Sequence, residues 1–167
     1  MPEPEPTREP TQRPTPRPTP TPTPEPTRPP TTQAPGLGTG TAVGSAAQGR
    51  EAVAWARTQI GKTYGWGSSG PEAFDCSGLT MRAWEAAGVG ITRTSRSQYL
   101  RVKKIQYSQM RPGDLIFWAN DTSDPGTIRH VAMYTGGGMM VEAARPGIPV
   151  REVPVHYADS MPYAGRP

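Results

Sequence analysis

The sequence predicts an α+β domain with a small antiparallel sheet, preceded by an extended segment rich in proline and threonine. Segments with helical periodicity come first and short β-rich segments come second, an order typical of α+β folds. In addition, 14 of the 22 prolines lie within the first 35 residues. A chain of 167 residues is long enough for one ordinary domain and a tail, but hardly for two domains.

Residues 1–35 alternate proline with threonine and charged residues, and they contain no aromatic or branched aliphatic side chain. Such a segment cannot offset the entropy lost on ordering, so we expect a disordered, polyproline-like stalk. Its four arginines and four glutamates cancel, which assigns the net charge of +4 to the rest of the chain. A glycine-rich hinge over residues 36–49 would connect the stalk to a folded domain at 50–167.

Two helices are expected at the start of the domain. Residues 51–60 place Val53, Ala56 and Ile60 at helical spacing, and Gly61 suits the C-terminal cap.

The second helix is expected to begin within residues 74–80, FDCSGLT. Asp75 would be its N-cap, Leu79 and Ala83 would face inward, and Gly88 would end it.

After Pro112 the pattern changes to short β-rich segments separated by Gly, Pro, Asn and Asp. The expected strands are residues 114–119, 130–135, 139–143 and 149–155.

Cys76, the only cysteine in the chain, would be the first residue of the second helix. Unpaired backbone N–H groups and the positive end of the helix dipole stabilise an anion there. Because the thiolate is the reactive form of cysteine, this position favours a nucleophile. The alternative is a small buried hydrophobic side chain, which is the commoner state of a free cysteine.

His130 opens the run HVAMYTGGGMMVEA, whose glycines at 136–138 predict a hairpin turn. If the hairpin is centred on Gly136, His130 faces Glu142, with Cβ atoms about 4.5 to 5.5 Å apart. Glu142 would then hold one imidazole nitrogen while the other faces a nucleophile. A two-residue turn would instead send Glu142 to the opposite face. The alternative interpretation of the pair is a surface glutamate beside a structural histidine.

A cysteine at a helix start, a histidine on a strand and a polar residue on the next strand have the composition of a thiol-nucleophile triad. The chain resembles the NlpC-type family of bacterial cell-wall endopeptidases in four motifs of matching order and spacing: FDCSGL, RTSRSQ, RPGDLIFW and HVAMYTGGGMMVEA. This resemblance implies a papain-like cysteine peptidase core in which the helices pack on the sheet.

The resemblance also implies roles for single residues. Cys76 would be the nucleophile, His130 the general base and then acid, and Glu142 the third, orienting residue. The family more often has His, Asn or Gln at that third position. Substrate contacts would come from Tyr64, Asp75, Ser77, Ser95 and Arg96.

Among these contacts, Tyr64 would line the site and help to bind the oxyanion. Asp75 and Ser77 would hold the free amino end of a wall peptide, although Asp75 also suits a plain helix N-cap. Ser95 and Arg96 would sit at the rim of the groove, where a purely structural loop is the alternative.

The implied reaction is hydrolysis of peptidoglycan stem peptides through a Cys76 acyl-enzyme, at the bond between D-isoglutamyl and diaminopimelic acid or the equivalent lysine-type bond.

The resemblance further implies an extracellular or wall-associated protein that needs no cofactor, and we expect a monomer. The stalk would let a small domain search a porous wall. The residues after Met1 do not form a signal peptide, and no apolar run is long enough for a transmembrane segment.

Other functions fit the same residues. One is a non-catalytic wall-binding module, and another is an amidase or acyltransferase of papain-like architecture, for which a deep apolar groove would be expected. A lysin or toxin would perform the same chemistry on another organism's wall.

The remaining features of the sequence indicate no further functional site. One cysteine and two distant histidines cannot make a zinc site, so no metal is expected. A basic stretch could attract anionic cell-wall polymers, but it lacks the aromatic interleaving typical of nucleic-acid binding. Its residues are Arg93, Arg96, Arg101, Lys103, Lys104 and Arg111. We expect the four tryptophans in the core or the groove wall, and no partner is evident for His156.

Overall fold

The computed structural model describes residues 40–167. The predicted stalk, residues 1–35, lies outside the described residues, and the predicted hinge is described only from Gly40 onward. Within residues 40–167, no helix is long and apolar enough to cross a membrane.

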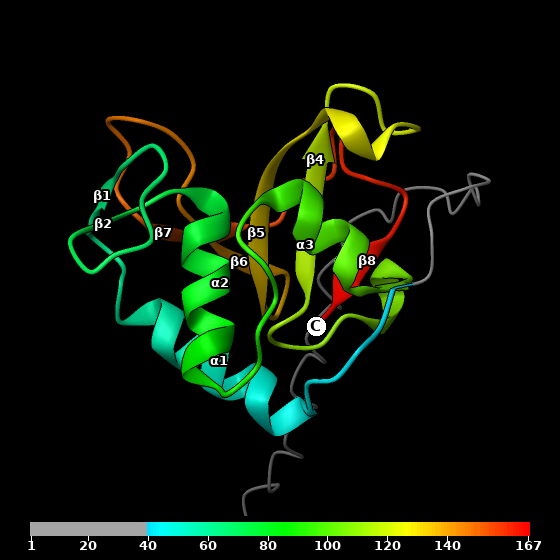
Figure 1. The fold of residues 1–167 in the computed structure, drawn as a ribbon, viewed down its shortest axis with the longest axis horizontal. Helices are drawn as coiled ribbons and strands as arrows, with labels where there is room; N and C mark the ends of the chain where they lie inside the picture. Colours follow the sequence, from blue (N-terminus) through cyan, green and yellow to red (C-terminus); the bar gives the residue numbers. More distant parts are fainter. Residues whose placement is uncertain (1–39) are drawn as a thin grey trace, which may run out of the picture.

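A six-stranded antiparallel sheet forms the centre of the domain (Figure 1), with strand order β3-β8-β4-β5-β6-β7. The strands are β3 (Lys103–Ile105), β4 (Leu115–Ala119), β5 (Ile128–Gly136), β6 (Met139–Glu142), β7 (Arg151–Pro154) and β8 (Ala164–Arg166). The four predicted strands are confirmed as β4 to β7. The short β3 and β8 were not predicted, nor was a separate parallel pair, β1 (Thr63–Tyr64) and β2 (Ala73–Phe74).

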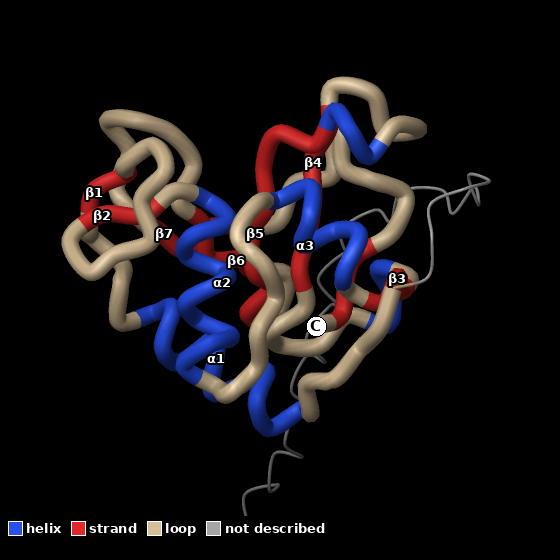
Figure 2. The backbone as a smooth tube through the Cα atoms, in the orientation of Figure 1, coloured by secondary structure: helices blue, strands red, loops and turns tan. Residues whose placement is uncertain are grey.

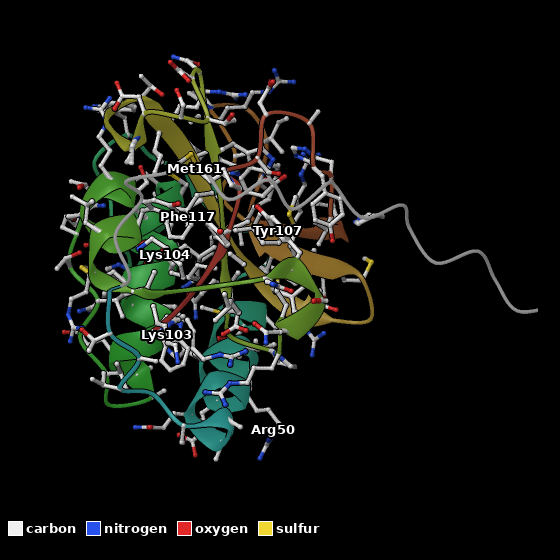
Figure 3. The ribbon with its side chains drawn as sticks, turned by 90° about the vertical axis from the view of Figure 1, so that its right-hand side faces the viewer. Arg50, Lys103, Lys104, Tyr107, Phe117 and Met161 are labelled. Carbon is white, nitrogen blue, oxygen red and sulfur yellow. The ribbon has the colours of Figure 1, made fainter. Side chains whose placement is uncertain are left out.

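Three α-helices lie on one face of this sheet (Figures 1 and 3): α1 (Ala46–Arg57), α2 (Cys76–Ala86) and α3 (Ser95–Arg101). Two single-turn 3₁₀ helices, η1 (Tyr107–Gln109) and η2 (Pro125–Thr127), complete the domain. Figure 2 shows the loop that connects α2 to α3. The mixed α+β fold with an antiparallel sheet is confirmed.

Helix α1 begins earlier than expected, inside the segment assigned to the hinge. Ser45 and Gln48 form a reciprocal capping box at its N-terminus, which satisfies two otherwise unpaired backbone groups. The helix ends at Arg57, so Ile60 lies beyond it and is 45% exposed instead of facing inward. Val53 and Ala56 are buried as predicted.

Helix α2 matches its prediction closely. Asp75 is the N-cap, and its Oδ1 accepts a hydrogen bond from the backbone N–H of Gly78 at 2.6 Å. Leu79 and Ala83 are buried, and the helix ends just before Gly88. A side chain at Gly78 would meet the Ser68 carbonyl oxygen at 2.3 Å, so the residue two positions after the cysteine must be glycine for the loop to pack here.

The two faces of the sheet carry separate apolar clusters. Phe117 belongs to the larger cluster beneath the helices, whereas Tyr107 and Trp118 belong to a smaller cluster. Figure 3 shows Phe117 directed toward the helical layer and Tyr107 on the other side of the sheet. Phe117 and Trp118 therefore follow the period-two alternation of a strand that is covered on both faces.

Candidate active site

Cys76 is the first residue of α2 and is half-buried. The N-cap bond of Asp75 fixes the start of the helix immediately before it. The thiol therefore lies at the amino end of an eleven-residue helix, where the first backbone N–H groups have no partner within the helix.

His130 lies on β5, directly opposite Trp118 on β4. Its Nε2 is 2.8 Å from Oε2 of Glu142, on β6. The other carboxylate oxygen of Glu142 accepts two hydrogen bonds from Arg151, at 2.8 and 3.0 Å, and Glu142 is only 3% exposed. Glu142 is therefore a buried carboxylate whose two oxygens are both occupied, one by His130 and one by Arg151.

The ionisation of this cluster follows from its contacts. Burial disfavours the charged imidazole, but the hydrogen bonds and charges of Cys76 and Glu142 outweigh burial and raise the pKa of His130 to about 9. Burial likewise opposes the charge of Glu142, yet His130 and Arg151 hold its pKa below the ordinary value. The arrangement thus favours an imidazolium between a carboxylate and a thiol. Because Nε2 is bound to Glu142, Nδ1 is the nitrogen left for Cys76.

The register of the β5–β6 hairpin differs from the expected one. Gly136 pairs with Met139 around a two-residue turn, and Tyr134 pairs with Met140, so Thr135 is an extra residue in a β-bulge. Extending the register past the bulge places Glu142 opposite Ala132, not His130. Since Ala132 and His130 share a face of β5, Glu142 still reaches His130 as a diagonal neighbour.

Trp118 supports the imidazole from the neighbouring strand. Its ring lies 5.2 Å from that of His130 and 4.8 Å from that of His156, with the planes tilted by about 35° in each case. Trp118 is buried, whereas His156 is exposed. The sequence showed no partner for His156, because stacking on a tryptophan depends on the path of the chain after β7.

Arg93 organises the other side of Cys76. It binds both carboxylate oxygens of Asp75, at 3.0 and 2.6 Å, and its guanidinium also donates to the hydroxyl of Ser77 at 3.1 Å. The Asp75 carboxylate therefore serves as helix cap and as partner of a cation at the same time. Sequence reasoning counted Arg93 only as part of a basic stretch, although its place in RTSRSQ was a signal for a role at this site.

Gln98 is a second residue that sequence reasoning missed. It is fully buried, and its amide nitrogen donates to the carbonyl oxygens of Ser77 at 2.9 Å and Thr92 at 3.1 Å. Its amide oxygen accepts from the hydroxyl of Thr80 at 2.8 Å. Gln98 thus ties α3 and its preceding loop to the first turn of α2, next to the thiol.

A groove of about 780 Å³ opens beside Cys76. All five predicted substrate contacts line it: Tyr64, Asp75, Ser77, Ser95 and Arg96. Trp66 also lines it and is 90% exposed, while the other three tryptophans are buried or pack against the core. The structure therefore brings the predicted contacts to one groove, although His130 and Glu142 lie beyond its lining.

Tyr64 is suited to donate a hydrogen bond in this groove. Burial and the nearby charges of Cys76 and Asp75 raise its pKa, against the opposing effect of Arg93. The phenol therefore stays protonated at neutral pH. Among residues 40–167, no group of three or more His, Cys, Asp or Glu side chains could hold a metal ion.

Comparison with known proteins gives consistent matches. The model of the NlpC/P60 family matches residues 61–162. A probable endopeptidase of Corynebacterium glutamicum is 39% identical over 120 residues, covering 71% of this chain and 53% of the relative. The peptidoglycan endopeptidase RipA of Mycolicibacterium smegmatis is 38% identical over 135 residues, covering 71% of this chain and 26% of the relative. The chain thus spans about half, or less, of the length of these relatives.

Solved structures share the fold. A hypothetical invasion protein of Mycobacterium tuberculosis aligns with a TM-score of 0.65 and 35% identity, covering 77% of this chain and 69% of the other. The NlpC/P60 domain of the peptidoglycan hydrolase SagA aligns with a TM-score of 0.63 and 35% identity, covering 71% of this chain and 98% of the other. The papain-like character of the fold rests on these likenesses. Three further solved structures are of RipA mutated at a cysteine, a histidine or a glutamate.

Proposed function

Because the chain belongs to the NlpC/P60 family, we propose that its domain is a cysteine peptidase that hydrolyses the stem peptides of bacterial peptidoglycan. The observation that carries the proposal is the cluster of Cys76, His130 and Glu142, in which the imidazole bridges a carboxylate and a thiol. The family relatives called endopeptidases support the same activity. In RipA, a cysteine, a histidine and a glutamate are the residues mutated in solved structures, and this chain carries the same three types.

In the proposed reaction, the Cys76 thiolate attacks the carbonyl carbon of the scissile amide. The His130 imidazolium gives its proton to the leaving amine as the C–N bond breaks, which leaves an acyl-enzyme. A water molecule then attacks the acyl carbon with His130 as general base, and the thiolate leaves. Glu142 keeps the imidazole oriented and stabilises its charged form.

The groove would hold the peptide on both sides of this bond. Tyr64, as a protonated phenol, would donate to the oxyanion that forms on the attacked carbonyl. Ser77 and Asp75 would contact the amino end of the peptide, although Arg93 already neutralises the charge of Asp75. Ser95 and Arg96 would contact the peptide from α3.

The proposed bond joins D-isoglutamate to diaminopimelic acid, or to lysine in walls of that type. The groove is lined by four charged side chains, which favour a polar peptide over the acyl chain that a lipid acyltransferase would bind: Asp75, Arg93, Arg96 and Arg129. An intact thiol–imidazole–carboxylate cluster argues against a wall-binding module without activity. We place the protein outside the cell or on the wall, where this substrate is, and anionic wall polymers are a second candidate partner.

Mass spectrometry of muropeptides tests the proposal directly. Purified wall is digested with the wild type and with Cys76→Ala, and the released fragments identify the bond that was cut. We expect the wild type to release peptides that begin with diaminopimelic acid or lysine and to leave isoglutamate as the last residue on the glycan, and Cys76→Ala to release none while keeping its thermal unfolding transition. Peptide release by a folded Cys76→Ala protein would refute the role of the thiol.

A further inference from the structure

The charges that line the groove do not balance. Three arginines line it, Arg93, Arg96 and Arg129, against the single carboxylate of Asp75. Arg93 and Asp75 form a two-point ion pair, so their charges cancel within the protein. Two guanidinium groups are left to meet whatever occupies the groove.

Arg96 is held in place but not neutralised. Its Nε donates to the carbonyl oxygen of Ile128 at 3.3 Å, which anchors the side chain against the start of β5. No carboxylate in the described part of the chain contacts its guanidinium. The two terminal nitrogens therefore keep their donors for a ligand, in the planar geometry that suits a carboxylate.

Arg129 adds a second cation at the same edge. It stands between Ile128, which anchors Arg96, and His130. Within residues 40–167 its one ionic partner is Asp159, at 3.2 Å, and the two side chains are 47% and 69% exposed. An exposed pair with a single contact contributes little energy, so a ligand carboxylate can replace Asp159 at small cost.

The two arginines lie where they can contact the leaving-group side of the scissile bond. In the proposed reaction, His130 protonates the leaving amine, so the residue that carries this amine must pass beside His130. Arg129 precedes His130 on β5, Arg96 is anchored to Ile128 at the start of the same strand, and both arginines line the groove beside Cys76. Because Asp75 and Ser77 are the proposed contacts for the amino end of the peptide, the two cations are available to the residue on the leaving side of the bond.

We propose that Arg96 and Arg129 form a carboxylate-binding subsite for the leaving-group residue. This inference rests on the proposed function and narrows its substrate to stem peptides whose third residue carries a free side-chain carboxylate. Diaminopimelic acid has such a group, its side-chain amide has lost the charge, and lysine has none. The subsite thus selects the diaminopimelic acid type of stem, unamidated, over the other two.

Binding to the full-length Cys76→Ala protein tests this selection without requiring catalysis. Three stem peptides that differ only at the third residue are compared by titration calorimetry: diaminopimelic acid, its side-chain amide, and lysine. We expect the diaminopimelic acid peptide to bind about tenfold more tightly than the other two, as one charge-assisted contact would give. Equal affinity for the three peptides would overturn the proposal.

Arginine variants in the same background locate the effect. Arg96→Gln and Arg129→Gln should each weaken binding of the diaminopimelic acid peptide several-fold and leave the lysine peptide within about twofold. Arg50→Gln, which makes the same change on α1 outside the groove lining, should alter neither (Figure 3). If a groove variant weakens all three peptides equally, its arginine has a structural role and the subsite is rejected.

Cleavage of the same three peptides by the wild type separates this inference from the proposed function. A wild type that cleaves all three at equal kcat/KM retains the proposed function and loses the subsite. A wild type that cleaves none loses the proposed function, while the binding series still decides whether the carboxylate is recognised. Sensitivity to amidation of the isoglutamate alone would place recognition on the other side of the bond and would also reject the subsite.

Discussion

Glu142 holds Nε2 of His130 at 2.8 Å although the two residues are not directly opposed on their strands. The extra residue Thr135 restores the register that a two-residue turn alone would have shifted by one, so Glu142 lies on the face of His130. Arg151, its direct partner on β7, binds the second oxygen of the carboxylate. The orientation of the imidazole thus depends on a bulged residue, Thr135, five positions after His130.

Replacing Glu142 with alanine is expected to lower kcat roughly 100-fold, because the imidazole loses the acceptor that orients it and stabilises its charge. The measurement is the rate of hydrolysis of a soluble stem peptide at saturating concentration. Arg151→Gln is the matched control: it removes the second partner of the carboxylate but leaves the contact with His130, so its effect should be much smaller. An unchanged rate in Glu142→Ala would show that another group orients His130.

From the raised pKa of His130 we predict how kcat/KM changes at alkaline pH. Because the imidazolium donates the proton to the leaving amine, kcat/KM should fall as the pH rises through about 9. Glu142→Gln keeps the shape of the side chain and removes its charge, so the falling limb should move to lower pH by about one unit. A limb that does not move in Glu142→Gln would contradict the electrostatic role of the carboxylate.

The raised pKa of His130 also makes the free energy of unfolding depend on pH. The folded-state pKa of His130, about 9, lies above its ordinary value of 6.5, so the folded protein binds more protons than the unfolded chain between these values. This contribution is fully present below 6.5 and is lost as the pH rises through about 9. Urea unfolding at pH 6 and pH 10 should show a larger loss of unfolding free energy in the wild type than in His130→Gln. Equal losses would mean that His130 is not the group responsible.

Much of the fold was predictable because local signals agreed with the tertiary contacts. FDCSGLT carries a capping aspartate and helix formers, and α2 begins and ends close to where these residues indicate. The segments that form β4 to β7 are short, β-rich and separated by turn residues, which is why they were found. The start of α1 was missed because a glycine-rich composition concealed the capping box of Ser45 and Gln48.

The site was less predictable where it depends on contacts between distant segments. The residues around Asp75 indicate that it caps a helix, but they do not predict that Arg93, 18 residues later, is its ionic partner. Arg151 likewise meets Glu142 only through the β6–β7 register. The bulge at Thr135 could not be predicted either, because the three consecutive glycines that follow it are compatible with several turn types and therefore with several registers.

The two functions of Asp75 can be separated by a pair of variants. Asp75→Ala removes the cap of α2 and leaves Arg93 without its partner, so we expect a loss of about 2 kcal/mol in unfolding free energy and a Tm lower by roughly 8 °C. Asp75→Asn keeps an oxygen for the N–H of Gly78 and loses only the ionic contact, so its loss should be smaller. Thermal unfolding measures both. Equal stability of wild type and Asp75→Ala would show that neither contact contributes.

Deleting residues 1–35 separates catalysis from access to the wall. The proposed catalytic residues and the groove lining lie between Tyr64 and Ala144, so cleavage of a soluble stem peptide should stay within about twofold of the full chain. The sequence of residues 1–35 predicts a tether, which would matter only when the substrate is an insoluble, porous wall. Release of fragments from purified wall should therefore fall more than soluble cleavage does. A collapse of soluble cleavage would reject the tether, because it would mean that residues 1–35 support the catalytic domain itself.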